Sequence, residues 1–189
     1  MQPKIFDTIT SAFERKEELA YFDKLDDYLD HLLPQVRPWG EDLRELEFYV
    51  GESWLEVRDD DNFNDIILHV FQENGDYLVS TNGTVKKGKW QLLNKDENKM
   101  LIEMGGASDL YELAFLDNNY LILKKHGNQL RLGKKKYFVM GKESEIYDLV
   151  WREYVEKMFE EYRQGSTAYI IMGIIFLVAV GLAVVLSVF

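Results

Sequence analysis

Three histidines and one acidic loop supply the residue types in this chain that could hold a metal ion. His31, His69 and His126 are too far apart in sequence to give the i, i+4 spacing that puts two ligands on one helix face. Residues 59–65 offer several hard oxygens, the ligands that Ca²⁺ prefers, but lack the sixth-position glycine and the closing glutamate of a calcium-binding loop. We therefore interpret these residues as three unrelated histidines and a solvated acidic loop.

Motifs for catalysis are not found in the sequence. It contains no Gly-x-Ser-x-Gly, no phosphate-binding glycine-rich loop with a lysine and no dinucleotide fingerprint. The chain has no cysteine, which excludes disulfides and a cysteine nucleophile. Its net charge of −11 argues against general nucleic-acid binding. We expect a protein that is not an enzyme and that uses no cofactor and no metal.

One segment reverses the acidic character of the chain. No acidic residue occurs between Asp117 and Glu143, whereas seven basic residues do. This segment could lie on anionic lipid headgroups or on an acidic partner, or it could be neutralised by the acidic segment that follows it. The candidate contact residues are Lys124, Lys125, Arg131, Lys134, Lys135 and Lys136.

The last 22 residues, 168–189, carry no charge. As a helix they would be about 33 Å long, enough to cross the hydrocarbon core of a bilayer. The start of the chain lacks the apolar run of a cleavable signal peptide. The sequence thus predicts a tail-anchored, single-pass protein, with the bulk of the chain in the cytoplasm, at a bacterial inner membrane. Small side chains at Ala179, Ala183 and Ser187 recur every four residues, which either marks a helix-pairing face or reflects ordinary span composition.

Two amphipathic helices should flank the middle of the chain. The first is expected over residues 11–33, because Ser11 and Glu14 have capping-box spacing and Pro34 should end the helix. Its apolar stripe could pack on the core or bind a partner: Phe22, Leu25, Leu29 and Leu32. The second is expected over residues 144–164, leading toward the membrane.

Between these helices, short apolar or alternating runs separated by turn residues predict strands. The expected strands are residues 54–57, 66–72, 77–81, 85–93, 100–104, 110–116, 120–125 and 137–140. Their connections are too short for crossover helices, so the sheet must be antiparallel and mostly a meander. Asn82-Gly83 is the strongest hairpin signal, because both residue types tolerate positive φ.

The fold class is therefore α+β: an antiparallel meander with an N-terminal helix and a C-terminal helix that leads into one transmembrane helix. The predicted regions are 1–33 (helical), 34–45 (linker), 46–140 (β domain), 144–164 (juxtamembrane helix) and 168–189 (transmembrane helix).

Residues 71–132 resemble the small lipocalin-like antiparallel domains of bacterial envelope and membrane proteins. The resemblance is carried by Asn74-Gly75-Asp76-Tyr77-Leu78, Gly83-Thr84-Val85, Gly88-Lys89-Trp90, Leu101-Ile102, Leu110-Tyr111-Glu112-Leu113 and Leu121-Ile122-Leu123. It implies a curved sheet or barrel and no particular chemistry.

Two functional hypotheses follow. In the first, the protein is a non-catalytic, tail-anchored docking or scaffolding module that contacts membrane lipid through its C-terminal helix and binds a protein partner. In the second, the sheet encloses a lipid or a small apolar ligand, although the aromatic residues that would line such a site more often fill the interior of a small barrel themselves.

Overall fold

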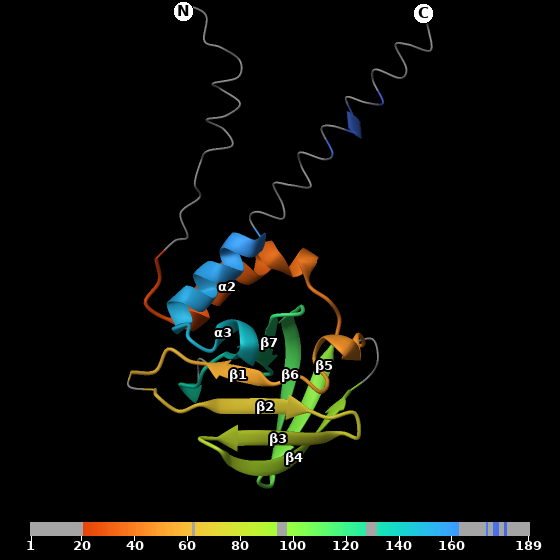
Figure 1. Cartoon of the computed structure of the whole chain (residues 1–189), viewed down its shortest axis with the longest axis vertical. Helices are drawn as coiled ribbons and strands as arrows, with labels where there is room; N and C mark the ends of the chain where they lie inside the picture. Colours follow the sequence, from red (N-terminus) through yellow and green to blue (C-terminus); the bar gives the residue numbers. More distant parts are fainter. Residues whose placement is uncertain are drawn as a thin grey trace, which may run out of the picture.

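In the computed structural model, eight antiparallel strands form a closed barrel (Figure 1). The structure describes residues 21–61, 63–93, 98–127 and 132–162, together with Gly173, Phe176, Leu177 and Val180. Each strand pairs with the strands that precede and follow it in sequence, and β8 pairs with β1 to close the ring. The strands are β1 (Trp54–Val57), β2 (Ile67–Phe71), β3 (Asp76–Thr81), β4 (Thr84–Leu92), β5 (Lys99–Met104), β6 (Ala107–Leu116), β7 (Tyr120–Lys125) and β8 (Tyr137–Lys142). The predicted antiparallel meander is confirmed, and its closure into a barrel is established by the β1–β8 pairing.

Local geometry shows why the hairpins form where the sequence predicts them. Asn82 and Gly83 both have positive φ, 49° and 86°, so the tight turn between β3 and β4 is of the kind whose twist matches that of the strands. Gly88 is required for a different reason: a Cβ at this position would lie 2.2 Å from the carbonyl oxygen of Glu103. The missing side chain lets β4 approach β5 closely where the sheet curves.

Side chains that point into the barrel form one of two apolar clusters. This inner cluster fills one end of the barrel, and the segment before β1 covers that end with Leu43 and Tyr49, which are buried. The indole of Trp54 donates a hydrogen bond of 3.0 Å to the carbonyl of Tyr49, and the hydroxyl of Tyr49 donates one of 2.9 Å to the carbonyl of Leu43. One end of the barrel is therefore packed shut.

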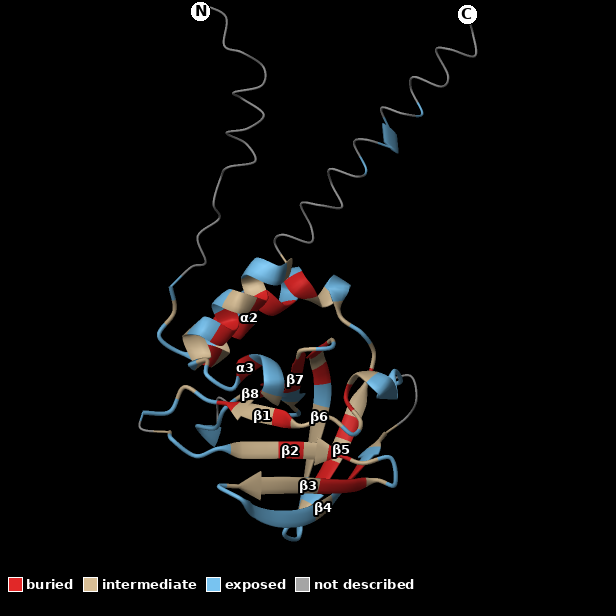
Figure 2. Cartoon of the chain, viewed as in Figure 1, coloured by how far each residue is buried: buried red, intermediate tan, exposed pale blue. Residues whose placement is uncertain are grey.

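The second apolar cluster lies outside the barrel, where two helices cover the outer faces of β1, β6, β7 and β8. These helices are α2 (Leu25–Val36) and a helix of residues 151–162, which lie side by side over this part of the barrel (Figure 1). Figure 2 shows the buried faces turned toward the strands and the exposed faces turned away from them. Tyr154 is buried between helix and barrel, and its hydroxyl donates a hydrogen bond of 2.9 Å to the carbonyl of Met140.

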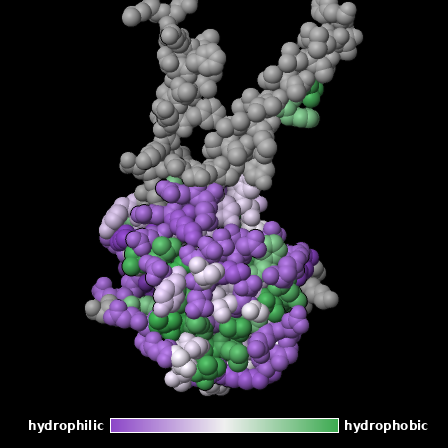
Figure 3. Space-filling model, viewed as in Figure 1, coloured by the Kyte–Doolittle hydropathy of each residue, from purple (hydrophilic) through white to green (hydrophobic). Residues whose placement is uncertain are grey.

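The outer faces of β2, β3 and β4 take no part in this helix-covered cluster. Figure 3 shows mainly hydrophilic residues over the helices. Over the strands, hydrophobic residues are visible among the hydrophilic ones. Val85 on β4 is 61% exposed.

The first helix begins later and ends later than its expected bounds within the described residues. Residues 21–24 are not helical, and α2 starts at Leu25, after Lys24 in an extended conformation. Pro34, expected to end the helix, lies inside it, and α2 continues to Val36. Burial of Leu32, Leu33 and Val36 against the barrel offsets the loss of the hydrogen bond that proline cannot donate. Two 3-10 turns follow, η1 (Arg37–Trp39) and η2 (Leu46–Phe48), in the expected linker and at the start of the expected β domain.

The second helix is interrupted. α3 (Glu143–Ile146) follows β8 directly, residues 147–150 are not helical, and the helix then continues over residues 151–162. The break leaves Tyr147 exposed, whereas Trp151, Tyr154, Met158 and Tyr162 pack against the outer cluster. This helix is thus part of the folded unit.

No helix among the described residues is both long and apolar enough to span a bilayer. The expected span, residues 168–189, and its small residues Ala179, Ala183 and Ser187 lie outside the described residues, apart from the four isolated positions named above.

Candidate functional cavity

A cavity of about 1140 Å³ occupies the barrel end opposite the packed one. Inward-facing side chains of β1, β2, β3, β5, β6, β7 and β8 line it, and it continues over the loops after β1 and before β8 to the start of α2. At this end long loops join β1 to β2 and β7 to β8, whereas two-residue turns join β3 to β4 and β5 to β6. A barrel of eight strands is the size at which the interior either fills with its own side chains or holds one small ligand.

A chain of three polar side chains lies on the wall of the cavity. The Glu56 side chain is 9% exposed, and one of its oxygens, Oε2, lies 3.1 Å from Nε2 of His69. The other ring nitrogen, Nδ1, lies 2.6 Å from the hydroxyl of Tyr77. Since a carboxylate only accepts, Nε2 donates to Glu56, and in the neutral imidazole Nδ1 then accepts from Tyr77. The three side chains are thereby fixed relative to one another.

Glu56 remains ionised in this buried position. Burial by itself raises its pKa, but hydrogen bonds from His69 and from Arg58 outweigh that effect and hold the pKa below its usual value. Nε of Arg58 lies 2.6 Å from Oε1 of Glu56. Arg58 stands nearer the opening and its side chain is 41% exposed. The deeper of the two charges is therefore negative.

Aromatic rings form much of the remaining wall. The ring of His69 stacks on that of Tyr77, with centroids 5.8 Å apart, and meets Phe138 edge-on at 4.9 Å. Phe138 in turn lies 5.7 Å from the ring of Tyr111. All four side chains line the cavity. Burial raises the pKa of Tyr111, and the negative charges of Asp109 and Glu56 raise it further.

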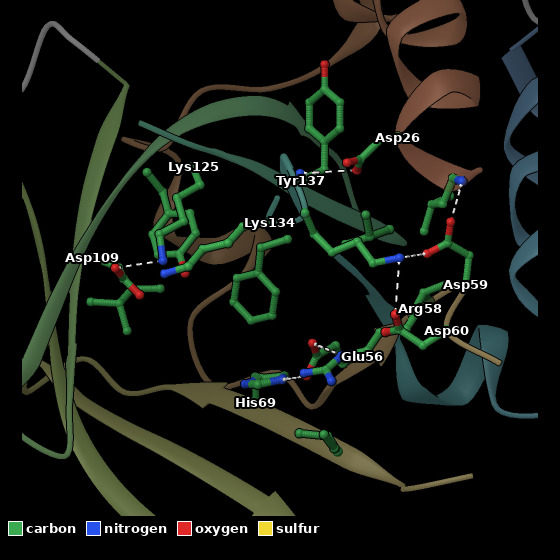
Figure 4. Close-up of a pocket in the computed structure, with 18 of the residues that line it drawn as sticks. Asp26, Glu56, Arg58, Asp59, Asp60, His69, Asp109, Lys125, Lys134 and Tyr137 are labelled. Carbon is green, nitrogen blue, oxygen red and sulfur yellow. Dashed lines mark hydrogen bonds and ion pairs between the residues drawn. The ribbon is translucent and has the colours of Figure 1, made fainter. Parts of the chain in front are cut away.

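Ion pairs ring the opening (Figure 4). Nζ of Lys125 lies 2.7 Å from Asp109 on one side. On the other side Lys135 pairs with both Asp59 and Asp60. Figure 4 shows these two groups on opposite sides of the cavity, with Glu56 and His69 between them. Altogether eight acidic and five basic residues line the cavity and its rim, a net charge of −3.

The structure divides the basic segment into two groups. Lys125, Lys134 and Lys135 line the cavity or its rim. Lys136 instead pairs with Asp30 of α2, and the positive charge of Lys124 also lowers the pKa of that carboxyl. Arg131 lies outside the described residues. Acidic residues of α2 and of the loop after β1 therefore face much of this segment, in place of the C-terminal acidic helix that we considered.

The three histidines lie on α2, on β2 and in the turn after β7. Among the described residues no group of three or more His, Asp or Glu side chains is arranged to hold a metal ion. In the acidic loop, Asp59 accepts a hydrogen bond of 2.8 Å from the backbone N–H of Leu25, and Asp65 accepts one of 2.7 Å from Asn82. These carboxylates link the loop to other parts of the protein.

Sequence reasoning missed the group of Glu56, His69 and Tyr77. A signal was present, because strict alternation from Trp54 puts Glu56 on the inward face of β1 and alternation from Phe71 puts His69 inward on β2. A polar residue on the apolar face of a strand is the informative deviation. That the three residues meet depends on the register of three strands, in which Trp54 is opposite His69 and Val79 is also opposite His69.

Comparison of the chain with known protein families, curated proteins and solved structures found no match. The lipocalin-like resemblance is thus supported by the architecture of an antiparallel eight-stranded barrel and not at the level of sequence.

Proposed function

We propose that this protein is a non-catalytic binding module whose barrel encloses a small ligand close to a membrane. The observation that carries the proposal is the cavity of about 1140 Å³ at one end of a barrel whose other end is packed shut. Ligand sites are typically concave, largely preformed and lined by apolar and aromatic side chains with a few placed polar groups. The wall formed by Tyr111, Phe138, Glu56 and His69 has this composition.

The same observations weaken the docking hypothesis. Its main support was the apolar stripe of the first helix, but Leu25, Leu29 and Leu32 are buried against the barrel of the same chain. Phe22 is partly buried on the same cluster. This surface is therefore not free to bind a partner in the folded protein.

The membrane location belongs to the proposal. It is supported by the charge-free, apolar composition of residues 168–189. A helix there would hold the barrel at the bilayer surface, where apolar and amphiphilic molecules are concentrated. The helix of residues 151–162 packs on the barrel, and the proposed anchor at residues 168–189 comes shortly after it in the sequence.

The test is to fill the cavity from the barrel wall. Val79 on β3 faces the cavity, opposite His69 in the neighbouring strand. We expect saturable binding of 1-naphthol, a small neutral aromatic, to the full chain in neutral detergent, and loss of that binding in Val79→Trp. Isothermal titration calorimetry with empty micelles as the blank gives the affinity.

Val85→Trp is the matched control, since Val85 lies on the next strand, is 61% exposed and does not line the cavity. Its affinity for 1-naphthol should equal that of the unaltered chain. If Val79→Trp loses its barrel circular-dichroism signal, Val79→Phe replaces it. Equal heats from both variants and the unaltered protein, or no saturable heat from any of them, would refute the proposal.

A further inference from the structure

We propose that the cavity recognises an organic cation, an amine or quaternary ammonium group on an apolar body, through the Glu56 carboxylate and the rings of Tyr77, Tyr111 and Phe138. The inference rests on the proposed function and names the ligand class of the same cavity. Three observations carry it.

The first observation is where the charges lie. Glu56 is a buried negative charge of the cavity wall, less exposed than its partner Arg58, and the net charge of the wall and rim is −3. Arg58 and His69 each occupy one oxygen of Glu56. A carboxylate has about four lone-pair sites, so a further donor from the ligand can still be accepted. An ionised carboxylate in a place of low solvent access attracts a cation more strongly than one in water.

The second observation is the aromatic wall. Tyr77, Tyr111 and Phe138 line the same cavity as Glu56. The rings of Tyr77 and Phe138 both contact His69, and those of Tyr111 and Phe138 are 5.7 Å apart. Aromatic faces attract cations within about 6 Å, and cages of such rings are the usual means of binding quaternary ammonium groups. A resident example already exists, since Nζ of Lys125 lies 6.0 Å from the centroid of Tyr111.

The third observation is that three of the five basic residues that line the cavity and its rim are already paired. Arg58 is bound to Glu56, Lys125 to Asp109, and Lys135 to Asp59 and Asp60. An anionic ligand would have to separate one of these pairs or depend on Lys24 and Lys134, which are exposed. Burial raises the pKa of Tyr111, and the negative charges of Asp109 and Glu56 raise it further, in a cavity whose wall and rim carry a net charge of −3. This field favours a cation over an anion.

The experiment compares three probes that share a benzene ring and differ in charge: benzyltrimethylammonium, benzyl alcohol and benzoate. Calorimetry on the full chain in neutral detergent should give the tightest binding for benzyltrimethylammonium, with benzoate weaker by about tenfold or more. Glu56→Gln should weaken benzyltrimethylammonium by about tenfold and change benzyl alcohol little. Glu103→Gln makes the same change of charge at an exposed carboxylate of β5 that does not line the cavity. It should change the affinity of neither benzyltrimethylammonium nor benzyl alcohol.

A second variant, Tyr111→Leu, removes a ring and leaves every charge in place. It should weaken benzyltrimethylammonium more than benzyl alcohol, and it decides the question if Glu56→Gln does not fold. The inference is overturned if 1-naphthol binds but benzyltrimethylammonium binds no tighter than benzyl alcohol, or if benzoate binds tightest. If 1-naphthol itself does not bind, the proposed function is refuted, and this inference, which rests on it, is refuted as well.

Discussion

Asp76 joins two strands through a pair of lysines. It lies at the start of β3, where Lys87 and Lys89 of β4 each place Nζ 2.5 Å from one of its oxygens. Asn74 donates a further hydrogen bond of 3.0 Å, and the Asp76 side chain is 7% exposed. The hydrogen bonds from Lys87 and Lys89 lower the pKa of this carboxyl to about 2, from a usual 3.8.

This pKa shift predicts a contribution to stability that depends on pH. Because the folded pKa lies below the unfolded one, the contribution is complete above about pH 4 and is lost as the pH falls toward 2. Asp76→Asn should therefore lower the thermal unfolding midpoint at pH 7, with a difference that shrinks toward zero by about pH 2. Circular dichroism melts at pH 7, 4 and 2 measure this. Asp27→Asn, on the exposed face of α2, is the control, and a difference for Asp76→Asn that did not depend on pH would contradict the prediction.

At the scale of elements, α2 is held on the barrel by polar and apolar contacts together. Its first N–H group, from Leu25, donates to Asp59 at 2.8 Å. Asp26 accepts the backbone N–H of Lys136 at 2.9 Å, and Asp30 accepts the hydroxyl of Tyr137 at 2.7 Å. Carboxylates in the first turns of the helix thus bind the segment that leads into β8, so that α2 closes over β8 and its loop.

The burial of α2 predicts that it is needed for the stability of the barrel. Leu29 has no exposed surface, and its truncation to alanine should cost about 2–5 kcal/mol through lost burial and the cavity left behind. Gln35→Ala, on the exposed side of the same helix, should stay within about 0.5 kcal/mol of the unaltered protein. Chemical denaturation followed by far-ultraviolet circular dichroism gives both values. Equal stabilities for the two variants would show that α2 docks only loosely.

At the scale of the whole molecule, the proposed anchor and the barrel should be separable. Deleting residues 168–189 removes the charge-free stretch and none of the residues in either apolar cluster. We expect the shortened protein to move from the membrane pellet to the supernatant after ultracentrifugation of cell lysates, with its affinity for 1-naphthol unchanged. A shortened protein that stays in the pellet yet remains folded would contradict the anchoring proposal, and a protein that loses 1-naphthol binding would show that the two parts depend on each other.

Much of the β region could be predicted from the sequence, because strands and tight turns are encoded locally. Short apolar runs between turn residues predicted β1 and β7 with the bounds that the structure has, and Asn82-Gly83 predicted its hairpin from the conformational tolerance of two residues. Short connections required antiparallel neighbours, and all the strand pairings of the barrel are antiparallel. These features depend on contacts between residues near one another in sequence.

What only the tertiary structure decided depends on contacts between distant residues. The β1–β8 pairing closes the barrel, although these strands lie at opposite ends of the β region. Burial against that barrel carries α2 through Pro34 and covers a stripe that in sequence alone looks equally suited to a partner. The register of three strands brings Glu56, His69 and Tyr77 together at the cavity. Sequence periodicity specifies which face of an element is apolar, whereas the free energy of packing decides what that face meets.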